Sequence, residues 1–354
     1  MQVIRSVSRN AFSNLALEEW LLANRNFSNQ RILYIYENSP SVVIGRHQNP
    51  WIECNVGQCG SRNVAIVRRH SGGGAVYHDI GNTNISFLTQ TKDYNRAANL
   101  ELIVRAMKRH FNINLTVSSR DDLLIHGKYK VSGSAARITR RGCYHHLTLL
   151  VDVDTSAIRD ILRSRMPIIQ SKATQSVPSP MGTLSQIRDS VTHQQVADAV
   201  ATEFLETGHA HTYSSTSVDP DEKRFPEISK LSNALRAWDW TYGKTPPFTV
   251  RREAVLPIGE MKLELQCIRG NITAASVDCP SLTYTDCSIM SQHLNGMNSS
   301  LSQTMFIKIW FLLQGQRFWP SDIRKAMSYA ARHLRDNGNE NSRLACDWVA
   351  ESVM

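Results

Sequence analysis

The segment from Arg68 to Asp79 reads RRHSGGGAVYHD and carries the densest group of residues in this chain that could bind an anion. Three consecutive glycines at 72–74 leave backbone N–H groups open to close approach by a phosphate or a carboxylate. Arg68 and Arg69, just upstream, supply guanidinium groups that suit the same anions. A glycine triplet by itself also fits an ordinary turn, so the prediction of an anion-binding loop depends on its surroundings.

Lys130 is the second residue that could take part in chemistry. It precedes Ser132 and Gly133 on a strand-like stretch, where a glycine lets a ligand approach the backbone. Lys128 lies two residues earlier and would face the same side of a regular strand, and an exposed strand lysine is the ordinary alternative for either residue. The sequence holds no convincing Ser-His-Asp or Cys-His set.

The histidines near these segments could suggest a metal site or a general base. We predict instead that His78, His145 and His146 make structural hydrogen bonds, because satisfied buried polar groups are the commoner case. For the same reason Asp79 is predicted to accept hydrogen bonds that fix its own loop. No metal site is expected.

Several helices and strands must position these residues. Helical spacing predicts helices at 11–24, 100–111, 193–206 and 230–238, the third opened by a capping box of Thr192 and Gln195. Runs of β-branched and aromatic residues predict strands at 32–36, 42–44, 63–67, 84–89, 115–117, 123–125, 129–135, 147–151, 248–250, 261–268 and 272–277. The glycines therefore fall on a loop between strands.

The order of these elements predicts the fold class. Strands and helices do not alternate regularly, which favours an α+β fold over a doubly wound sheet. Residues 208–226 are rich in Ser, Thr, Asp and Pro and are predicted to form a surface loop. The sequence pattern changes near residue 246, where two prolines precede a new set of predicted strands. We therefore expect a larger domain at 1–246 and a smaller one at 247–354 that ends in helices.

Composition narrows the class of partner. The 354 residues are 42% hydrophobic and 20% charged, as in ordinary globular proteins, and no apolar run reaches the roughly 20 residues of a membrane span. A formal charge of +9 favours an anionic partner: a nucleotide, an acidic protein surface or nucleic acid. The basic residues are dispersed without a recognised aromatic–basic module, which argues against nucleic acid. Seven cysteines at scattered spacings, Cys54 and Cys59 included, argue for reduced thiols.

Five separated stretches together carry a family resemblance. They are NLALEEW at 14–20, PSVVIGRHQNPW at 40–51 with ECN at 53–55, the glycine segment with GNTN at 81–84, KVSGSA at 130–135 with YHHLTLL at 144–150, and WDWTYGKTP at 238–246. In this order they resemble the lipoate–protein ligase A and lipoyltransferase family. The resemblance implies a biotin/lipoate ligase-like fold of mixed, mostly antiparallel sheets with helices, plus a small α+β C-terminal accessory domain. Residues 1–246 would then bind lipoyl-adenylate and carry out catalysis.

The resemblance also implies a reaction. A lipoyl group would move from lipoyl-AMP, or from a lipoylated donor protein, to a specific lysine of lipoyl domains in 2-oxoacid dehydrogenase complexes or of the glycine cleavage H protein. Because AMP is a good leaving group, the enzyme would mainly position the reactants and neutralise developing charge. Lys130 would bridge the acyl oxygen and the α-phosphate. The other residues implied to contact the adenylate are Arg69, Gly73, Gly74, Ala75, Val76, Tyr77, Arg120, Thr148 and, more weakly, Thr174.

Two alternatives within this chemistry stay open. A complete ligase would make lipoyl-AMP from lipoate, ATP and Mg²⁺, whereas a transferase would hold no tightly bound cofactor. An octanoyl or lipoyl amidotransferase would use a cysteine thioester, for which Cys143 beside Arg140 and Arg141 is the candidate. The sequence around Arg46 and Pro50 resembles the mitochondrial lipoyltransferases of animals more than the bacterial ligases, so we expect a monomeric mitochondrial transferase. The first residues are basic and lack acids, but the family's first helix leaves little room for a leader, so we expect the numbering to begin at a mature or shortened end.

Overall fold

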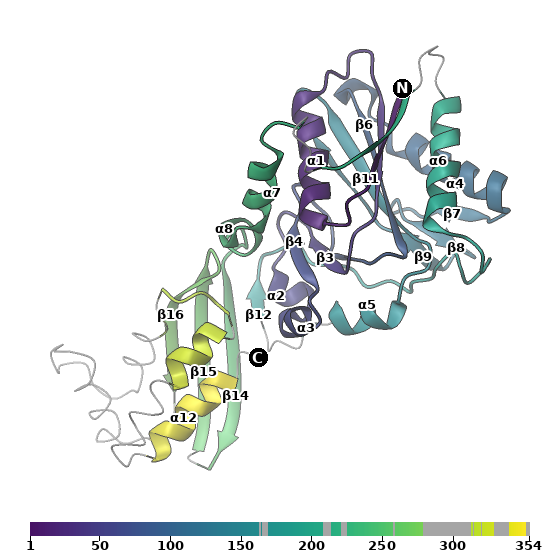
Figure 1. The fold of residues 1–354 in the computed structure, drawn as a ribbon. Helices are drawn as coiled ribbons and strands as arrows, with labels where there is room; N and C mark the ends of the chain where they lie inside the picture. The colour runs from purple at the N-terminus through teal and green to yellow at the C-terminus, as the bar shows by residue number, and fades with distance from the viewer. Residues whose placement is uncertain are drawn as a thin grey trace. The chain divides into compact units, whose positions relative to one another are not determined.

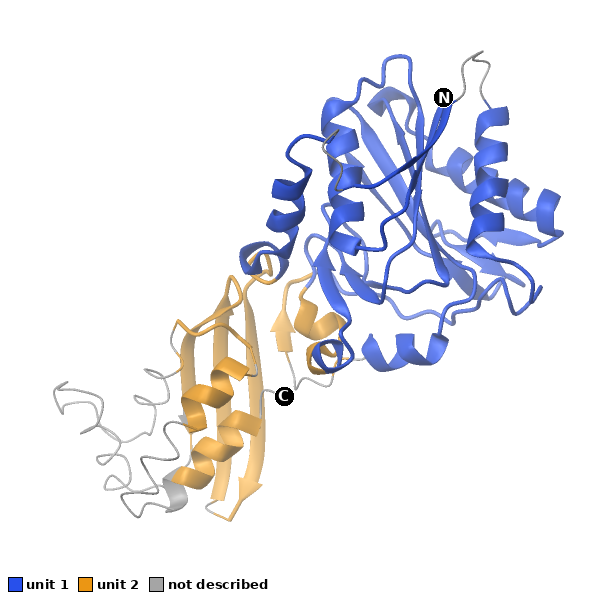
Figure 2. Ribbon diagram, viewed as in Figure 1, with its two compact units in different colours: residues 1–48, 58–163, 174–241 blue, residues 49–57, 164–173, 242–354 orange. Residues whose placement is uncertain are grey.

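A computed structural model gives the fold and describes residues 1–162, 164, 169–207, 214–220, 225–257, 259–278, 313, 315–319, 321–328 and 340–351. The chain divides into two compact units, coloured separately in Figure 2. Unit 1 comprises residues 1–48, 58–163 and 174–241, and unit 2 comprises residues 49–57, 164–173 and 242–354. Among the described residues, no helix is both long and apolar enough to cross a membrane.

Unit 1 is built on a six-stranded mixed sheet (Figure 1). Its strands, in spatial order, are β10 (Ser134–Ile138), β11 (Cys143–Leu150), β6 (Asn82–Thr89), β2 (Ile32–Tyr36), β1 (Gln2–Ser6) and β13 (Ser214–Val218). The first four pair antiparallel, and β1 pairs parallel with both of its neighbours.

Both faces of this sheet are covered, which explains why β2 (ILYIY) is apolar throughout and buried at every position. Leu33 and Ile35 face one core, where they pack with helices α4 (Arg96–Phe111) and α6 (His193–Glu206). Ile32, Tyr34 and Tyr36 face a second core with α1 (Ala11–Asn24) and α7 (Ile228–Arg236). The predicted helices 11–24 and 193–206 are confirmed, including the capping box of Thr192 and Gln195.

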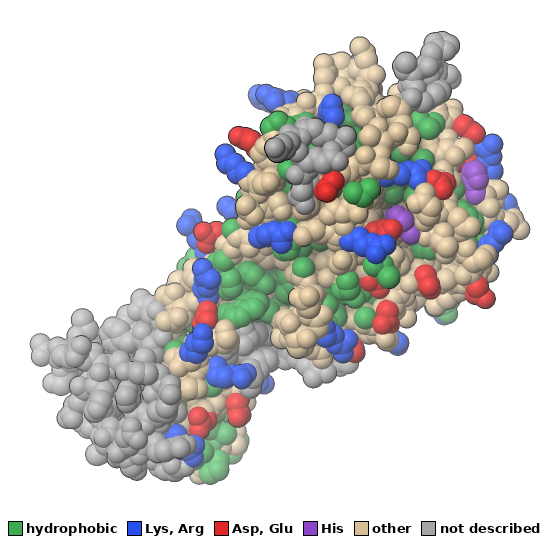
Figure 3. Space-filling view, viewed as in Figure 1, with side chains coloured by type: hydrophobic (Ala, Val, Ile, Leu, Met, Phe, Trp, Pro, Cys, Tyr) green, Lys and Arg blue, Asp and Glu red, His purple; other side chains and the backbone are tan. Residues whose placement is uncertain are grey.

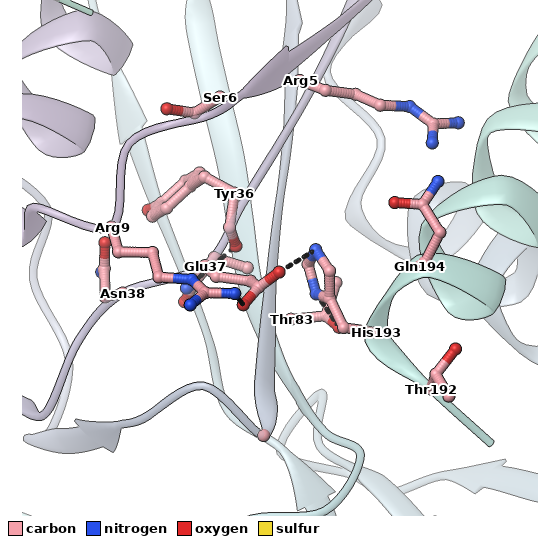
Figure 4. A network of polar contacts seen from close by, with 12 residues as sticks. Arg5, Ser6, Arg9, Tyr36, Glu37, Asn38, Thr83, Thr192, His193 and Gln194 are labelled. Carbon is pink, nitrogen blue, oxygen red and sulfur yellow. Dashed lines mark hydrogen bonds and ion pairs between the residues drawn. The ribbon is translucent and has the colours of Figure 1, made fainter. Parts of the chain in front are cut away.

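A polar network fixes the start of α6 to the sheet (Figure 4). His193, the first residue of that helix, places Nε2 3.1 Å from Glu37 Oε1, just beyond β2, and Nδ1 2.8 Å from Thr83 Oγ1 on β6. Arg9 Nη2 reaches the other oxygen of Glu37 at 3.3 Å. Burial lowers the pKa of His193, which favours the neutral ring beside the positive end of the helix dipole.

Two three-stranded sheets complete the β structure of unit 1. One has the order β4–β3–β5, formed by Ala65–Arg68, Ser41–Ile44 and Val76–His78, and the glycine segment connects β4 to β5. The other has the order β7–β8–β9, formed by Leu115–Val117, Leu123–Ile125 and Tyr129–Ser132. The prediction that the glycines lie on a loop between strands is therefore confirmed.

Unit 2 holds an antiparallel sheet with the order β12 (Ile169–Ser171), β14 (Phe248–Leu256), β15 (Gly259–Ile268) and β16 (Asn271–Asp278). Helix α12 (Glu340–Glu351) follows later in the chain, and residues 321–328 are also helical. An aromatic cluster lies at the core of this unit, with the Trp51 ring 5.2 to 5.5 Å from the rings of Tyr242, Phe248 and Phe318.

This cluster explains how the observed units differ from the predicted division at 246. Trp51 belongs to a short segment far earlier in the chain, yet its ring is fully buried among aromatic residues of unit 2. A boundary placed by local composition gives only contiguous domains, so it could not include residues 49–57 or 164–173.

Several element predictions need correction. Residues 214–218 were expected in a surface loop but form β13, a parallel edge strand whose SSTSV sequence has one buried residue and relies on backbone pairing. The predicted strand 129–135 is two strands interrupted at Gly133. Residues 208–213, 221–224 and most of 279–339 lie outside the described residues. The predicted strands and helices miss five short helical segments, which are α2 (Pro50–Glu53), α3 (Val56–Ser61), α5 (Thr155–Ile161), α8 (Trp238–Thr241) and the 3₁₀ turn Thr91–Asp93.

Candidate active site

Unit 1 contains a cavity of about 290 Å³, near the lower end of the size range of small-molecule sites. Nine of the ten predicted site residues line it: Arg69, Gly73, Gly74, Ala75, Val76, Arg120, Lys130, Thr148 and Thr174. The tenth, Tyr77, does not. Alternation along β5 turns Val76 and His78 toward the cavity and buries the Tyr77 side chain elsewhere, so the flat contact of Tyr77 with the adenylate stays a prediction that this cavity does not support.

Lys130 is held at this cavity by both its side chain and its backbone. Its Nζ lies 2.8 Å from Asp122 Oδ1, a carboxylate whose side chain is 12% exposed. Its backbone N–H donates to the Pro180 carbonyl at 2.8 Å, and its own carbonyl accepts from Gly182 at 3.0 Å. A Cβ at Gly133 would lie 3.7 Å from Lys130 Nζ, so the glycine keeps the space beside the ammonium free.

Lys128 has a different environment from Lys130. It lies on the turn before β9, where His126 and Gly127 adopt positive φ angles of 52° and 64°. Its side chain is exposed, with Nζ 5.1 Å from the Tyr129 ring centre, and it does not line the cavity. The regular strand that would have turned both lysines to one side begins only at Tyr129.

The glycine loop has a backbone that larger residues could not adopt. Gly73 has a φ of +85°, and a Cβ on Gly45 would lie only 2.1 Å from the Gly73 carbonyl oxygen. Ser176, on a segment that also lines the cavity, accepts a hydrogen bond from the Ala75 N–H at 2.8 Å and another from Gln48 Nε2 at 3.1 Å. The loop is thus packed closely on two other segments.

The two arginines of the motif organise the backbone. Arg68 is fully buried, and its guanidinium donates to the carbonyls of Gly45, Arg46, Gln48, Trp240 and Thr241.

Arg69 holds the glycine loop from inside. Its Nη2 donates to the carbonyls of Gly72 and Gly74, Nη1 donates to Val43 at 2.9 Å, and Nε donates to Ser71 Oγ at 2.9 Å. Burial lowers its pKa to about 10. A role of Arg69 in neutralising a phosphate stays a prediction.

The three histidines make hydrogen bonds, as predicted. His78 Nδ1 lies 2.9 Å from Asn38 Nδ2, and His145 Nδ1 lies 3.2 Å from Asn99 Nδ2. His146 contacts both Glu18 and Ser71.

Burial also sets the charge state of two of these rings. It lowers the pKa of His78 and of His145 to about 3, so both are neutral at neutral pH. Asp79 accepts from the Gly81 and Asp154 N–H groups at 2.8 and 3.1 Å, which confirms its prediction as a loop-fixing acceptor.

Cys143 lies on β11 with its thiol 3.6 Å from the Thr89 carbonyl oxygen. Burial raises its pKa to about 11, the opposite of what a nucleophilic thiol needs. It does not line the cavity. Across the described residues, no three His, Cys, Asp or Glu side chains are grouped as metal ligands would be.

The cavity is also lined by apolar residues that the sequence did not identify, which are Leu15, Tyr36, Val43, Ala135 and Leu147.

Asp122 and Ser176 were also missed as site residues. Asp122 reaches Lys130 across the β8–β9 hairpin, so a hairpin register prediction could have found it. Ser176 reaches Ala75 from 101 positions away, and no local signal points to that contact.

Known proteins share this architecture and much of the sequence. A family model described as the lipoyl protein ligase A/B catalytic domain matches residues 10–205. Human "Lipoyl amidotransferase LIPT1, mitochondrial" is 38% identical over 287 residues, covering 78% of this chain and 76% of that protein. Lipoate-protein ligase A of Bdellovibrio bacteriovorus is 34% identical over 343 residues, covering 95% of this chain and 94% of that protein.

The structural comparison agrees. The crystal structure of P. falciparum LipL1 in complex with lipoate matches with a TM-score of 0.59 and 25% identity, covering 99% of both chains. The fold is thus of the biotin/lipoate ligase type, as the resemblance predicted.

Proposed function

The chain belongs to the lipoyl protein ligase A/B family and is an enzyme of the lipoyltransferase and lipoate–protein ligase type, and from this premise we propose that it is a transferase. It moves a lipoyl group from a preformed donor, lipoyl-AMP or a lipoylated protein, to one lysine of an acceptor protein. The acceptors are lipoyl domains of 2-oxoacid dehydrogenase complexes and the glycine cleavage H protein.

One observation carries this proposal: the glycine loop, Lys130 and several apolar residues line the same cavity. The apolar residues suit an alkyl chain and a dithiolane ring, which gain free energy by leaving water. The basic residues suit a phosphate, because Arg69, Arg120 and Lys130 outnumber the one carboxylate, Asp122, among the described lining residues.

The bond changes need no nucleophile from the protein. The acceptor amine attacks the acyl carbon of lipoyl-AMP, a C–N bond forms, and the bond from that carbon to the phosphate oxygen breaks. AMP leaves with the electron pair, and the amine proton passes to solvent. Lys130 stabilises the tetrahedral oxyanion and the departing phosphate, and Asp122 keeps the ammonium in place before the donor binds.

The alternative of a complete ligase has weaker support from the cavity. Mg²⁺ with ATP is usually bound through one or two carboxylates and the substrate phosphates. Of the residues that the structure describes, Asp122 is the one carboxylate that lines the cavity, and it is already paired with Lys130 at 2.8 Å, so a metal ion would compete with the ammonium. A thioester on Cys143 is also less well supported, because that thiol is buried with a pKa raised to about 11.

A comparison of donors tests the proposal. Purified protein is supplied with an acceptor lipoyl domain and, separately, lipoate with ATP and Mg²⁺, lipoyl-AMP, or lipoylated H protein. The acceptor mass is then followed over time. We expect rapid lipoylation from lipoyl-AMP or from the lipoylated protein. An equal rate from lipoate with ATP would show a complete ligase and contradict the proposal.

A matched pair of lysine variants tests the site. Lys130→Ala should lower the transfer rate by roughly 10²- to 10³-fold, since it removes a preorganised charge at the oxyanion. Lys128→Ala should leave the rate within twofold, because that side chain is exposed and does not line the cavity. Equal losses in both variants would mean that the essential charge has been assigned wrongly.

The proposal extends to location and partners. The name of the human relative supports a mitochondrial location. We further propose a monomer without a tightly bound cofactor. Basic and acidic side chains of the described residues are interspersed on the face in Figure 3, and nucleic acid would favour a continuous basic stripe instead. The formal charge of +9 suits an acidic acceptor domain.

A further inference from the structure

A chain of buried contacts runs from helix α1 to the glycine loop, and two of its members, His146 and Arg69, line the cavity. Both carboxylate oxygens of Glu18 lie close to His146 Nδ1, at 3.0 and 3.1 Å. His146 Nε2 lies 2.8 Å from Ser71 Oγ, and Ser71 Oγ lies 2.9 Å from Arg69 Nε. The Glu18 side chain is 1% exposed, and that of His146 is 12% exposed.

The direction of each hydrogen bond follows from the charged groups at the two ends. Arg69 Nε can only donate, so Ser71 Oγ accepts from it. At the other end the Glu18 carboxylate can only accept, so His146 Nδ1 donates to it. A neutral ring with its proton on Nδ1 accepts from the Ser71 hydroxyl at Nε2. Every group in the chain has its donor or acceptor matched.

These three groups occur in serine hydrolases, but here they cannot supply a nucleophile. Ser71 is 1% exposed and does not line the cavity, and one lone pair of its oxygen is engaged by Arg69. A hydrolytic attack would need this oxygen at the substrate. Instead, the hydrogen-bonded chain links the Glu18 carboxylate to a buried guanidinium.

The buried guanidinium explains why such a device is needed. Arg69 donates to four acceptors, the oxygens of Val43, Gly72 and Gly74 and the Ser71 hydroxyl, none of which carries a formal charge. A buried cation is costly without a counter-charge. Glu18 supplies that charge through two intermediate groups, and the guanidinium turns the carbonyls of Gly72 and Gly74 inward.

We propose that Glu18, His146 and Ser71 form a positioning relay that holds Arg69, and through it the glycine loop, in the conformation that binds the acyl donor. The inference rests on the proposed function, since it assigns the donor to that loop. Glu18 and Ser71 do not line the cavity and act through Arg69 and the loop backbone, so substituting either residue changes donor binding more than acceptor binding.

Steady-state kinetics of Glu18→Gln, Ser71→Ala and their double variant test the relay. Each single variant should raise KM for lipoyl-AMP about tenfold and leave KM for the acceptor domain unchanged. Because both changes break one relay, the double variant should also show about a tenfold increase. An increase near 100-fold would mean independent effects and overturn the relay. A loss of kcat with unchanged donor KM would indicate only a smaller folded fraction and would also overturn it.

Glu19→Gln is the matched control. Glu19 is the neighbouring carboxylate on α1, and its side chain is 12% exposed. It pairs with Arg137, Tyr144 and His70, none of which belongs to the relay, and its nearest oxygen lies 3.4 Å from His70 Nδ1. This variant should leave the donor KM unchanged even if it lowers the melting temperature.

Hydrogen exchange of the amides of residues 71–77, which leaves out His70 as a contact of Glu19, gives a readout that needs no lipoyl donor. Glu18→Gln and Ser71→Ala should speed its exchange, and Glu19→Gln should not. If the wild type transfers lipoyl from no donor but this pattern holds, the proposed function fails and the relay stands. Unchanged exchange in both relay variants overturns the relay.

Discussion

Alanine substitutions at Gly72 and Gly73, two neighbouring positions of the glycine triplet, should have very different effects on donor binding. At Gly72 an added Cβ would meet nothing within 4 Å, so Gly72→Ala should change stability by less than about 0.5 kcal/mol. At Gly73 the φ of +85° disfavours any L side chain, at a cost of roughly 1–2 kcal/mol. The same Cβ would lie 3.1 Å from Arg69 Nη2 and disturb its bonds to the loop carbonyls.

The total cost at Gly73 follows from these two effects. A hydrogen bond to a charged group contributes roughly 1.5–3 kcal/mol, so loss of one such bond brings the cost of Gly73→Ala to about 3 kcal/mol. The loop can relieve this strain by opening, so the cost should appear mainly in ligand affinity. About 3 kcal/mol corresponds to a roughly 100-fold weaker Kd.

Calorimetric titration with a non-hydrolysable lipoyl-adenylate analogue measures this Kd. Gly73→Ala should weaken binding about 100-fold, Gly72→Ala should match the wild type, and the melting temperatures of the two variants should differ little. Equal Kd values for both variants would refute the reasoning, because positive φ and contact with Arg69 are what distinguish the two positions.

Three further perturbations follow from other contacts. Gly45→Ala should abolish donor binding or folding, because its Cβ would lie 2.1 Å from the Gly73 carbonyl oxygen; a crystal structure of the variant with an unmoved loop would contradict this. His78 and His145, with pKa values lowered to about 3, stay neutral in the folded chain while the unfolded chain takes up protons below pH 6.5. The free energy of unfolding should therefore fall toward acid pH by roughly 1 kcal/mol per unit for each ring, and urea titrations of His145→Asn should show a shallower decline. Cys143→Ala should keep the wild-type transfer rate, and an acyl-thioester on Cys143 detected by mass spectrometry would argue against the proposed mechanism.

The local sequence determined the elements that carry the site. The apolar spacing of residues 11–24 and the capping box at Thr192 depend on contacts three or four positions apart, and both helices form as predicted. The glycine triplet between two β-branched runs predicted a loop between strands, because these signals also come from neighbouring residues in the chain. The family motifs then brought nine predicted residues to one cavity.

Only the tertiary structure decided how those residues are supported. The contact of Ser176 with Ala75 and the path from Glu18 to Arg69 each join positions far apart in the chain.

Tyr77 shows that a motif in the sequence does not by itself place a side chain in the cavity. Its motif is intact, but the pleat of β5 turns the side chain away from the cavity. Hydrogen-bonding patterns within an element repeat along the chain and can be read locally. Which side chains meet across a cavity depends on strand register and packing, and these are fixed only when the sheets and helices assemble.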